Sequence, residues 1–226
     1  MSYGVRLRVY GERACFTRPE MKVERVSYDV MTPSAARGIL EAILWKPQIR
    51  WVVDKIHVLK PIRFQSFRRN EVSMKASADK ARSAMRAGNV AGLGLVVEDH
   101  RQQRATTLLV HVDYIIEAHF ELTAKAEPDD TPAKYISIFN RRAASGQCFH
   151  RPYFGTREFA AAFDLIPEDA PLPTHGLPAT QANQELGWML HDIDFTGGRN
   201  EPRFFRARLK DGVLDVGACL KEGTAA

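Results

Sequence analysis

The stretch Thr32-Pro-Ser-Ala-Ala-Arg-Gly-Ile-Leu-Glu-Ala-Ile-Leu-Trp-Lys-Pro47 encodes one complete helix. Thr32, or Ser34 after Pro33, provides the side-chain oxygen that caps the free amides of the first turn. Lys46-Pro47 ends the helix, because proline lacks a backbone donor and restricts the residue before it. The apolar side chains between these limits recur at helical spacing and form one face. They are Ile39, Leu40, Ile43 and Leu44.

Segments on both sides of this helix predict strands, because they alternate apolar and charged residues or are rich in β-branched ones. Val5-Arg-Leu-Arg-Val-Tyr10 precedes the helix, and residues 49–59 and 62–67 follow it. Residues 105–122 form a further, longer strand. Between them, residues 70–104 are rich in Ala, Lys and Gly with weak periodicity, and we interpret them as an insertion.

A second helix is expected after the turn Glu127-Pro-Asp-Asp-Thr-Pro132, with Asp130 or Thr131 as its N-cap and Pro132 at its first position. Residues 151–166 then give a loop and a strand. The element order is β-α-β-β-α-β, which is the split β-α-β, ferredoxin-like order that the RRM module shares. We therefore predict an α+β domain over residues 1–166.

The rest of the chain, residues 167–226, predicts a linker and a small C-terminal β-hairpin subdomain. Residues 167–184 are dense in Pro, Thr, Ala and Asn, which is typical of a linker. Residues 186–195 and 203–209 are strand-like and flank the turn residues 196–200. A two-stranded hairpin is not stable alone, so we expect it to dock on the main sheet.

Charge is unevenly distributed in this chain of 226 residues, whose net charge is +5. Positions 46–69 carry seven cations against the single anion Asp54, whereas positions 98–130 carry eight acids against three cations. Such asymmetry favours a surface for a polyanion. An ordinary solvated surface is the alternative that charge alone leaves open.

Targeting and metal-binding signals are not evident. Cys15, Cys148 and Cys219 form no CxxC and no zinc spacing. The N-terminus lacks the apolar segment of a secretory signal, and no apolar run reaches the ~18 residues that span a bilayer. We expect a soluble cytoplasmic protein that uses no metal or cofactor and has no membrane partner.

Four blocks of the sequence carry a family resemblance. They are Pro19–Pro47, Gln102-Gln-Arg104, Glu117-Ala-His-Phe120 and Pro152–Phe159. Together they resemble the Dvulg-subtype (type I-C) CRISPR-associated proteins, the repeat-RNA endoribonucleases of the RAMP superfamily. The resemblance implies a ferredoxin-like RNA-binding core and metal-independent cleavage of CRISPR repeat RNA. It also implies that the 5′ handle of the crRNA stays bound within an interference complex.

The same resemblance implies a catalytic trio, a tyrosine near the end of the first helix and a Lys-His pair on the second. Here the tyrosine position is Leu44, and the pair corresponds to Lys134 and Tyr135. Lys134 is the predicted catalytic cation. Tyr135 is predicted to donate a hydrogen bond or shuttle a proton, although its ordinary pKa of about 10 suits a base only if Lys134 lowers it. His119 and His150 are the next candidates, with a structural role as the more ordinary alternative for each.

Phosphate contacts are assigned to basic residues, since the planar fork of arginine binds two oxygens at once. They are Lys22, Arg25, Arg37, Arg68, Arg69, Arg141, Arg142 and Arg157. Tyr28 is equally suited to stacking on a base and to anchoring the arm before the first helix. Tyr10, Phe16 and Phe64 are further stacking candidates, with core packing as the alternative.

These observations predict a repeat-processing endoribonuclease of a type I-C CRISPR system. Its expected partners are CRISPR repeat RNA, the mature crRNA and other subunits of the interference complex. A non-catalytic scaffold that clamps the 5′ handle or contacts duplex DNA is the alternative. An unrelated basic RNA-binding protein with an RRM-like core would require the four block matches to be accidental.

Overall fold

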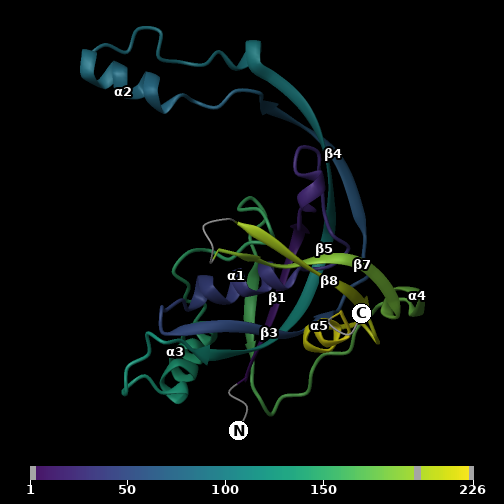
Figure 1. Cartoon of the computed structure of the whole chain (residues 1–226). Helices are drawn as coiled ribbons and strands as arrows, with labels where there is room; N and C mark the ends of the chain where they lie inside the picture. Colours follow the sequence, from purple (N-terminus) through teal and green to yellow (C-terminus); the bar gives the residue numbers. More distant parts are fainter. Residues whose placement is uncertain (1–3, 196–199, 224–226) are drawn as a thin grey trace. The chain divides into compact units, whose positions relative to one another are not determined.

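The helix expected from the opening stretch is α1 (Pro33–Ile43) in the computed structural model, which describes residues 4–195 and 200–223 (Figure 1). The Thr32 hydroxyl accepts a hydrogen bond from the Ala35 amide at 3.2 Å, so it is the cap. Ile39, Leu40 and Ile43 are fully buried. Burial of each such side chain contributes roughly 1.5–3 kcal/mol, which explains why this face directs the packing of the helix.

The main sheet has the strand order β6-β1-β5-β3-β9, and each of these neighbouring pairs is antiparallel. Its strands are β1 (Gly4–Ala14), β3 (Ile49–Val58), β5 (Arg101–Leu122), β6 (Ala162–Ile166) and β9 (Val213–Asp215), with the short β2 (Arg25–Val26) also paired to β5. The order of β1, β3, β5 and β6 is that of a split β-α-β arrangement. The predicted α+β class is confirmed.

The core lies between one face of this sheet and the helices α1 and α3 (Pro132–Ala144). Successive side chains of a strand point to opposite faces. Phe120 of β5 and Trp51 of β3 therefore meet on the helix side, with ring centroids 5.3 Å apart. The ring centroid of Trp51 also lies 4.9 Å from that of Phe139 of α3, so one aromatic cluster joins both strands to this helix.

The last carbonyl groups of α1 receive donors from other parts of the chain. The Phe149 amide donates to the Ala42 carbonyl at 2.8 Å, and the Arg142 guanidinium to that of Ile43 at 2.9 Å. The Trp51 indole donates to the Leu44 carbonyl at 2.8 Å. A helix leaves its final carbonyls without intrahelical partners, so these contacts fix the end of α1 against β3, α3 and the segment that follows α3.

The C-terminal hairpin forms a separate two-stranded sheet of β7 (Gln184–Asp194) and β8 (Glu201–Leu209). The expected turn at 196–200 lies largely in residues 196–199, outside the described residues. The hairpin packs against α1 rather than extending the main sheet. Arg37 of α1 donates twice to Asp192, at 2.9 and 2.8 Å, and the Leu190 amide donates to the Tyr28 hydroxyl at 3.2 Å.

Three short elements complete this part of the chain. They are η1 (Pro19–Met21), α4 (Ala179–Ala182) and α5 (Val216–Gly223). The linker that contains α4 is held to the chain after β3, because the Gln181 side chain bonds both the amide and the carbonyl of Ile62. Across the described residues, no helix combines the length and the apolar character needed to cross a membrane.

Contacts divide the chain into two compact units, residues 1–65 with 107–226 and residues 66–106. The second unit contains most of β4 (Phe64–Val72), which pairs with β5, and also α2 (Ala78–Ala87) and η2 (Val97–His100). Ser77 caps α2 and the left-handed Gly88, with φ 59°, ends it. No residue of α2 is buried, so this helix contributes little to a core.

We expect the ion pairs of Arg37 to stabilise the attachment of the hairpin. Burial opposes its charge, but the carboxylates of Asp192 and Glu41 outweigh burial and raise the pKa of Arg37. Arg37→Met should lower the free energy of unfolding by about 1–3 kcal/mol, because it removes a charged donor from the partly buried carboxylates of Asp192 and Glu41. The matched control Arg50→Met removes an exposed ion pair with Glu121. It should change the free energy of unfolding by less than about 1 kcal/mol. Equal losses in chemical denaturation would contradict this role for Arg37.

Candidate active site and nucleic-acid interface

The predicted catalytic pair lies in the first turn of α3. The Thr131 hydroxyl accepts a hydrogen bond from the Lys134 amide at 3.3 Å, and Pro132 takes the first helical position. The adjacent Tyr135 is buried, with its ring centroid 6.1 Å from that of Phe120. The core therefore holds the phenol in place, while the neighbouring ammonium group projects toward solvent.

Asp130 joins the two side chains of this pair. Its Oδ1 accepts hydrogen bonds from the Tyr135 hydroxyl at 2.6 Å and from Lys134 Nζ at 2.9 Å. Its Oδ2 accepts one from the Glu127 amide at 3.0 Å. These donors, Tyr135 foremost, lower the pKa of Asp130 to about 2. The sequence indicated Asp130 only as a candidate cap, although its place four residues before Lys134 was a signal for this ion pair.

The carboxylate determines what each partner can do. Burial, followed by the hydrogen bond to Asp130, raises the pKa of Tyr135 to about 12. The sequence left open that Lys134 lowers the pKa of Tyr135, but the shift is in the opposite direction. The phenol is therefore a poor general base near neutral pH. Lys134 has a side chain that is 48% exposed, so it presents a positioned cation to solvent.

The position at which the family pattern has a tyrosine is apolar and enclosed. Leu44 is fully buried and follows the last helical residue of α1 in an extended conformation. Its polar contacts are those of its backbone, because its amide donates to the Leu40 carbonyl and its carbonyl accepts from Trp51. No proton-transfer group stands at this position, so the trio implied by the resemblance is reduced to Lys134 and Tyr135.

His119, an alternative candidate, lies on the opposite face of the main sheet. Phe120 faces α3, so the side chain before it points away from that helix. Its Nδ1 lies 2.9 and 2.8 Å from the two carboxylate oxygens of Asp54. Asp54 sits at a register shift between β3 and β5, and such a bulge can redirect a side chain. Because the sheet separates His119 from Lys134, the two groups are not brought together.

Three of the cations assigned to phosphate are engaged within the protein. Arg37 is held by the carboxylates described above, and Arg142 donates to a carbonyl at the end of α1. Arg25 lies 4.0 Å from Glu158. These contacts give each side chain a role in the fold, and phosphate binding by them stays a prediction.

Of the other assigned cations, Arg69 is half-buried and the rest are exposed. In the larger unit, three side chains make no hydrogen bond or ion pair with any other residue that the structure describes. They are Lys22, Arg141 and Arg157. Arg68 and Arg69 belong to the unit of residues 66–106, where the Arg69 guanidinium lies 4.9 Å from the Phe67 ring. Their contact with nucleic acid also stays a prediction.

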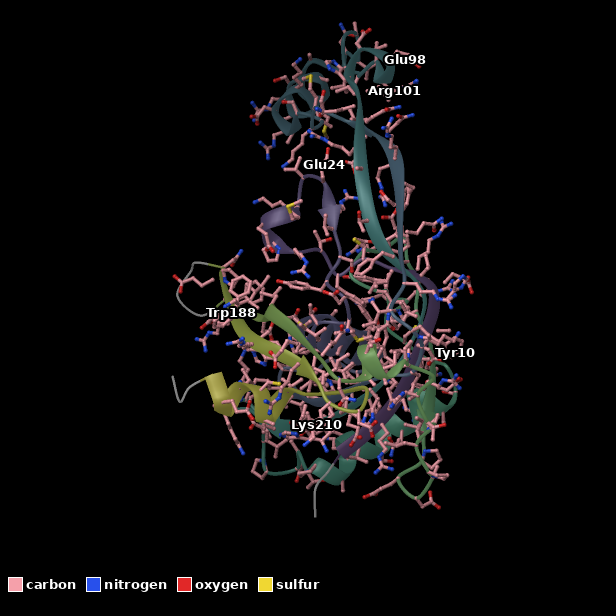
Figure 2. The ribbon with its side chains drawn as sticks, turned by 90° about the vertical axis from the view of Figure 1, so that its right-hand side faces the viewer. Tyr10, Glu24, Glu98, Arg101, Trp188 and Lys210 are labelled. Atoms are coloured by element: carbon pink, nitrogen blue, oxygen red, sulfur yellow. The ribbon has the colours of Figure 1, made fainter. Side chains whose placement is uncertain are left out.

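The aromatic candidates differ in exposure. Tyr28 is buried, and its hydroxyl accepts a hydrogen bond from the hairpin. The Arg18 guanidinium lies 4.5 Å from its ring centroid, so Tyr28 has an anchoring role. Tyr10 and Phe64 are 36% and 46% exposed. Figure 2 shows Tyr10 on β1 and, on the other side of the same unit, Trp188 of β7. Trp188 is 66% exposed and was not identified as a candidate from the sequence.

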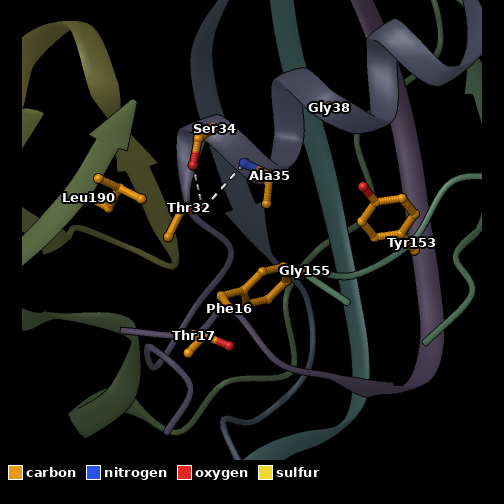
Figure 3. Close-up of a pocket in the computed structure, with 9 residues that line it drawn as sticks. All are labelled: Phe16, Thr17, Thr32, Ser34, Ala35, Gly38, Tyr153, Gly155 and Leu190. Atoms are coloured by element: carbon orange, nitrogen blue, oxygen red, sulfur yellow. Dashed lines mark hydrogen bonds between the residues drawn. The ribbon is translucent and has the colours of Figure 1, made fainter. Parts of the chain in front are cut away.

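A pocket of about 290 Å³ opens beside the N-terminal half of α1 (Figure 3), and we call it the α1 pocket. The aromatic rings of Phe16 and Tyr153 and the backbone of Gly155 line it, and Gly38 of α1 leaves space where a side chain would stand. The remaining lining residues are Thr17, Thr32, Ser34, Ala35 and Leu190. The sequence analysis did not identify this pocket. Gly38 is the residue that could have indicated it, because glycine inside a helix is destabilising and needs a compensating reason.

Metal-ligating side chains do not converge in the described part of the chain. Within residues 4–195 and 200–223, no group of three or more His, Cys, Asp or Glu side chains is arranged to hold a metal ion. The histidines are dispersed instead. His57 contacts Glu117, His119 contacts Asp54, and His175 contacts Asp211.

Comparison with known proteins extends over nearly the whole chain. A family model described as CRISPR-associated protein (Cas5) matches residues 4–217. A protein of Mannheimia succiniciproducens named CRISPR pre-crRNA endoribonuclease Cas5d is 59% identical over 216 residues, 96% of each chain. A Thermus thermophilus protein of the same name is 41% identical, with 95% of this chain and 91% of the relative covered. A crystal structure described as a CRISPR-associated protein has a TM-score of 0.68 at 24% identity, covering 97% and 94% of the two chains, and supports the fold.

The low pKa of Asp130 predicts a stability difference that depends on pH. A carboxyl whose pKa is depressed on folding stabilises the protein above its unfolded value, near 4, and this contribution is lost as pH falls toward 2. Asp130→Asn should therefore lower the melting temperature at pH 6, and its difference from the wild type should shrink below pH 4. Asp129→Asn, at the exposed neighbour, should melt like the wild type. A difference that is absent at pH 6 or unchanged at low pH would contradict the assigned ion pair.

Proposed function

This chain belongs to the Cas5 family of CRISPR-associated proteins, and we propose that it is an endoribonuclease that cleaves CRISPR repeat RNA to mature crRNA. The family assignment confirms the resemblance drawn from the sequence. The observation that carries the proposal is the 59% identity, over 96% of both chains, to a protein named as a pre-crRNA endoribonuclease. Similarity over the whole length supports a shared reaction, because it includes the sheet, both main helices and the hairpin.

The proposed reaction uses the 2′-hydroxyl of the RNA as nucleophile. Its attack on the adjacent phosphate breaks the bond to the 5′ oxygen of the next nucleotide and leaves a 2′,3′-cyclic phosphate and a 5′-hydroxyl. The reaction needs a base, an acid and a cation near the phosphorane. Lys134 suits the cation, since Asp130 positions its exposed ammonium. Tyr135 suits a hydrogen-bond donor, since its pKa is raised to about 12.

We further propose that the protein stays bound to the 5′ handle of the crRNA within the type I-C interference complex in the cytoplasm. Exposed cations without internal partners support a polyanionic ligand. Lys22, Arg141 and Arg157 are of this kind. Duplex DNA is a further candidate ligand for the same basic surface.

A non-catalytic scaffold that clamps the handle is the second candidate function. It is favoured by two observations, the buried Leu44 at the tyrosine position and the commitment of the Tyr135 hydroxyl to Asp130. A scaffold needs cations that bind phosphate but no proton transfer. RNA cleavage by the purified protein would exclude this candidate, and binding without cleavage would support it.

We expect cleavage of the protein's own repeat RNA to persist in excess EDTA, because the 2′-hydroxyl mechanism needs no metal-bound water. The assay is gel separation of labelled RNA after incubation with the purified protein, with heat-treated protein as the control for contaminating nucleases. Loss of cleavage on chelation, with recovery on added magnesium or manganese, would contradict the proposed mechanism.

Replacing Lys134 should slow this reaction far more than it weakens RNA binding. Removing one positioned group that stabilises the transition state typically lowers the rate on the order of 10²–10³-fold. We expect a loss of that size in single-turnover cleavage for Lys134→Ala and a smaller loss for Tyr135→Phe. Lys125→Ala removes an exposed lysine before α3 and should react like the wild type. Wild-type rates in both Lys134→Ala and Tyr135→Phe would show that the catalytic centre lies elsewhere in the protein.

A further inference from the structure

Three aromatic rings follow α3 and lead along α1 to the α1 pocket. Phe149 and His150 have ring centroids 6.1 Å apart, and His150 stacks on Tyr153 at 6.2 Å with an interplanar angle of 29°. Tyr153 then forms part of the pocket wall (Figure 3). We call Phe149, His150 and Tyr153 the ring strip. Phe149 is 89% exposed, His150 is exposed and Tyr153 is half-buried. A single exposed apolar side chain is ordinary, but a row of three rings that ends at a pocket is not.

The backbone of the ring strip is fixed at both ends. The Phe149 amide donates to the Ala42 carbonyl of α1 at 2.8 Å, and the Cys15 amide donates to the Phe154 carbonyl at 3.1 Å. Gly155 has a φ of +79°, and a Cβ there would lie 2.0 Å from the Cys15 carbonyl oxygen. These contacts hold the backbone of the ring strip beside the end of α1 and the residue that follows β1.

The electrostatic surroundings of the ring strip are positive. The segment from residue 131 to residue 157 contains no Asp or Glu. Its charged residues are Lys134, Arg141, Arg142, Arg151 and Arg157. The side chains of Arg141, Arg151 and Arg157 are exposed and make no ion pair within the described residues. Three carboxylates near the pocket residues in sequence are matched by arginines, because Asp29 pairs with Arg18, and Glu41 and Asp192 pair with Arg37.

From these observations we infer that the ring strip and the α1 pocket form a binding site for consecutive unpaired bases of RNA, with one base seated in the pocket. This inference rests on the proposed function and adds the site to it. Base–aromatic stacking tolerates any base, since every base has a π-face, and cations beside the rings hold the backbone. Stacked bases inside a duplex do not present their faces, so the site selects single-stranded segments.

The pocket adds a means of discriminating the seated base. Its volume, about 290 Å³, lies near the lower limit of small-molecule sites, roughly 300–1,000 Å³, and is large enough for one base. The Thr32 and Ser34 hydroxyls lie 3.1 Å from each other at its α1 side. Hydroxyl groups can donate or accept, so they can bond the edge of the base while the half-buried ring of Tyr153 contacts its face.

The test is fluorescence anisotropy of a labelled single-stranded repeat RNA, titrated at several salt concentrations. Phe149→Ala should weaken binding roughly 5- to 150-fold, the usual range for loss of one stacked base. The salt dependence should stay unchanged, because no phosphate contact is lost. Arg151→Ala should instead lower the log–log salt slope by about one. A blunt-ended RNA duplex of the same length should bind Phe149→Ala as it binds the wild type.

A second variant tests the pocket. A Cβ at Gly38 meets no atom within 4 Å, so Gly38→Leu should fill the pocket without straining α1 and should also weaken single-stranded binding. Phe204→Ala, which removes a ring that is 43% exposed on the hairpin, is the matched control and should bind like the wild type. Circular dichroism and the melting temperature show whether each variant is folded.

The outcomes separate this inference from the proposed function. If Phe149→Ala and Gly38→Leu bind RNA with wild-type affinity and cleavage is intact, only the inference is overturned. The exposed rings would then be interpreted as a contact surface for a protein partner. A comparable loss on duplex RNA would also overturn it, because stacking on unpaired bases would not be the cause. If the wild type neither binds nor cleaves its repeat RNA, the proposed function itself fails.

Discussion

The carbonyl oxygens at the C-terminal end of α1 set the constraint on which the arrangement of the larger unit depends. Their donors come from Trp51 of β3, Arg142 of α3 and the Phe149 amide. A buried carbonyl without a donor costs free energy comparable to a lost hydrogen bond, so these three segments must converge there. The convergence sets the place of α3 and its first turn, and it brings the ring strip alongside α1.

The proposed chemistry depends on how that arrangement is used. The site at the first turn of α3 keeps a positioned cation, Lys134, but its phenol is committed to Asp130 and the tyrosine position is Leu44. Under this proposal, proton transfer has to come from another group or from solvent, while the ammonium stabilises the transition-state charge. His119 does not fill this role in the same site, because it faces the other side of the main sheet, paired with Asp54.

Local signals predicted the fold well, and long-range pairings account for what they missed. Thr32 caps α1 as its local sequence predicted, because caps act on their own neighbourhood, whereas the helix ends at Ile43, earlier than Lys46-Pro47 indicated. The pairing of Arg37 with Asp192 joins residues 155 positions apart, and nothing in either local sequence indicates the other. The placement of Asp54 against His119 likewise depends on a register shift between two strands, which appears only when they pair. Lys134 was identified from its motif, whereas the carboxylate that controls it required the packed helix.

The central claim is that the RNA supplies its own nucleophile at a site that stabilises the phosphorane. A repeat RNA with a single 2′-deoxy substitution at the nucleotide on the 5′ side of the scissile phosphate tests it directly, with the same substitution one nucleotide further along as the control. The account predicts that the first RNA binds with wild-type affinity but is not cut there, and that the control is cut normally. Cleavage of the first RNA at the unmodified rate would show that another nucleophile attacks the phosphate and would contradict the account.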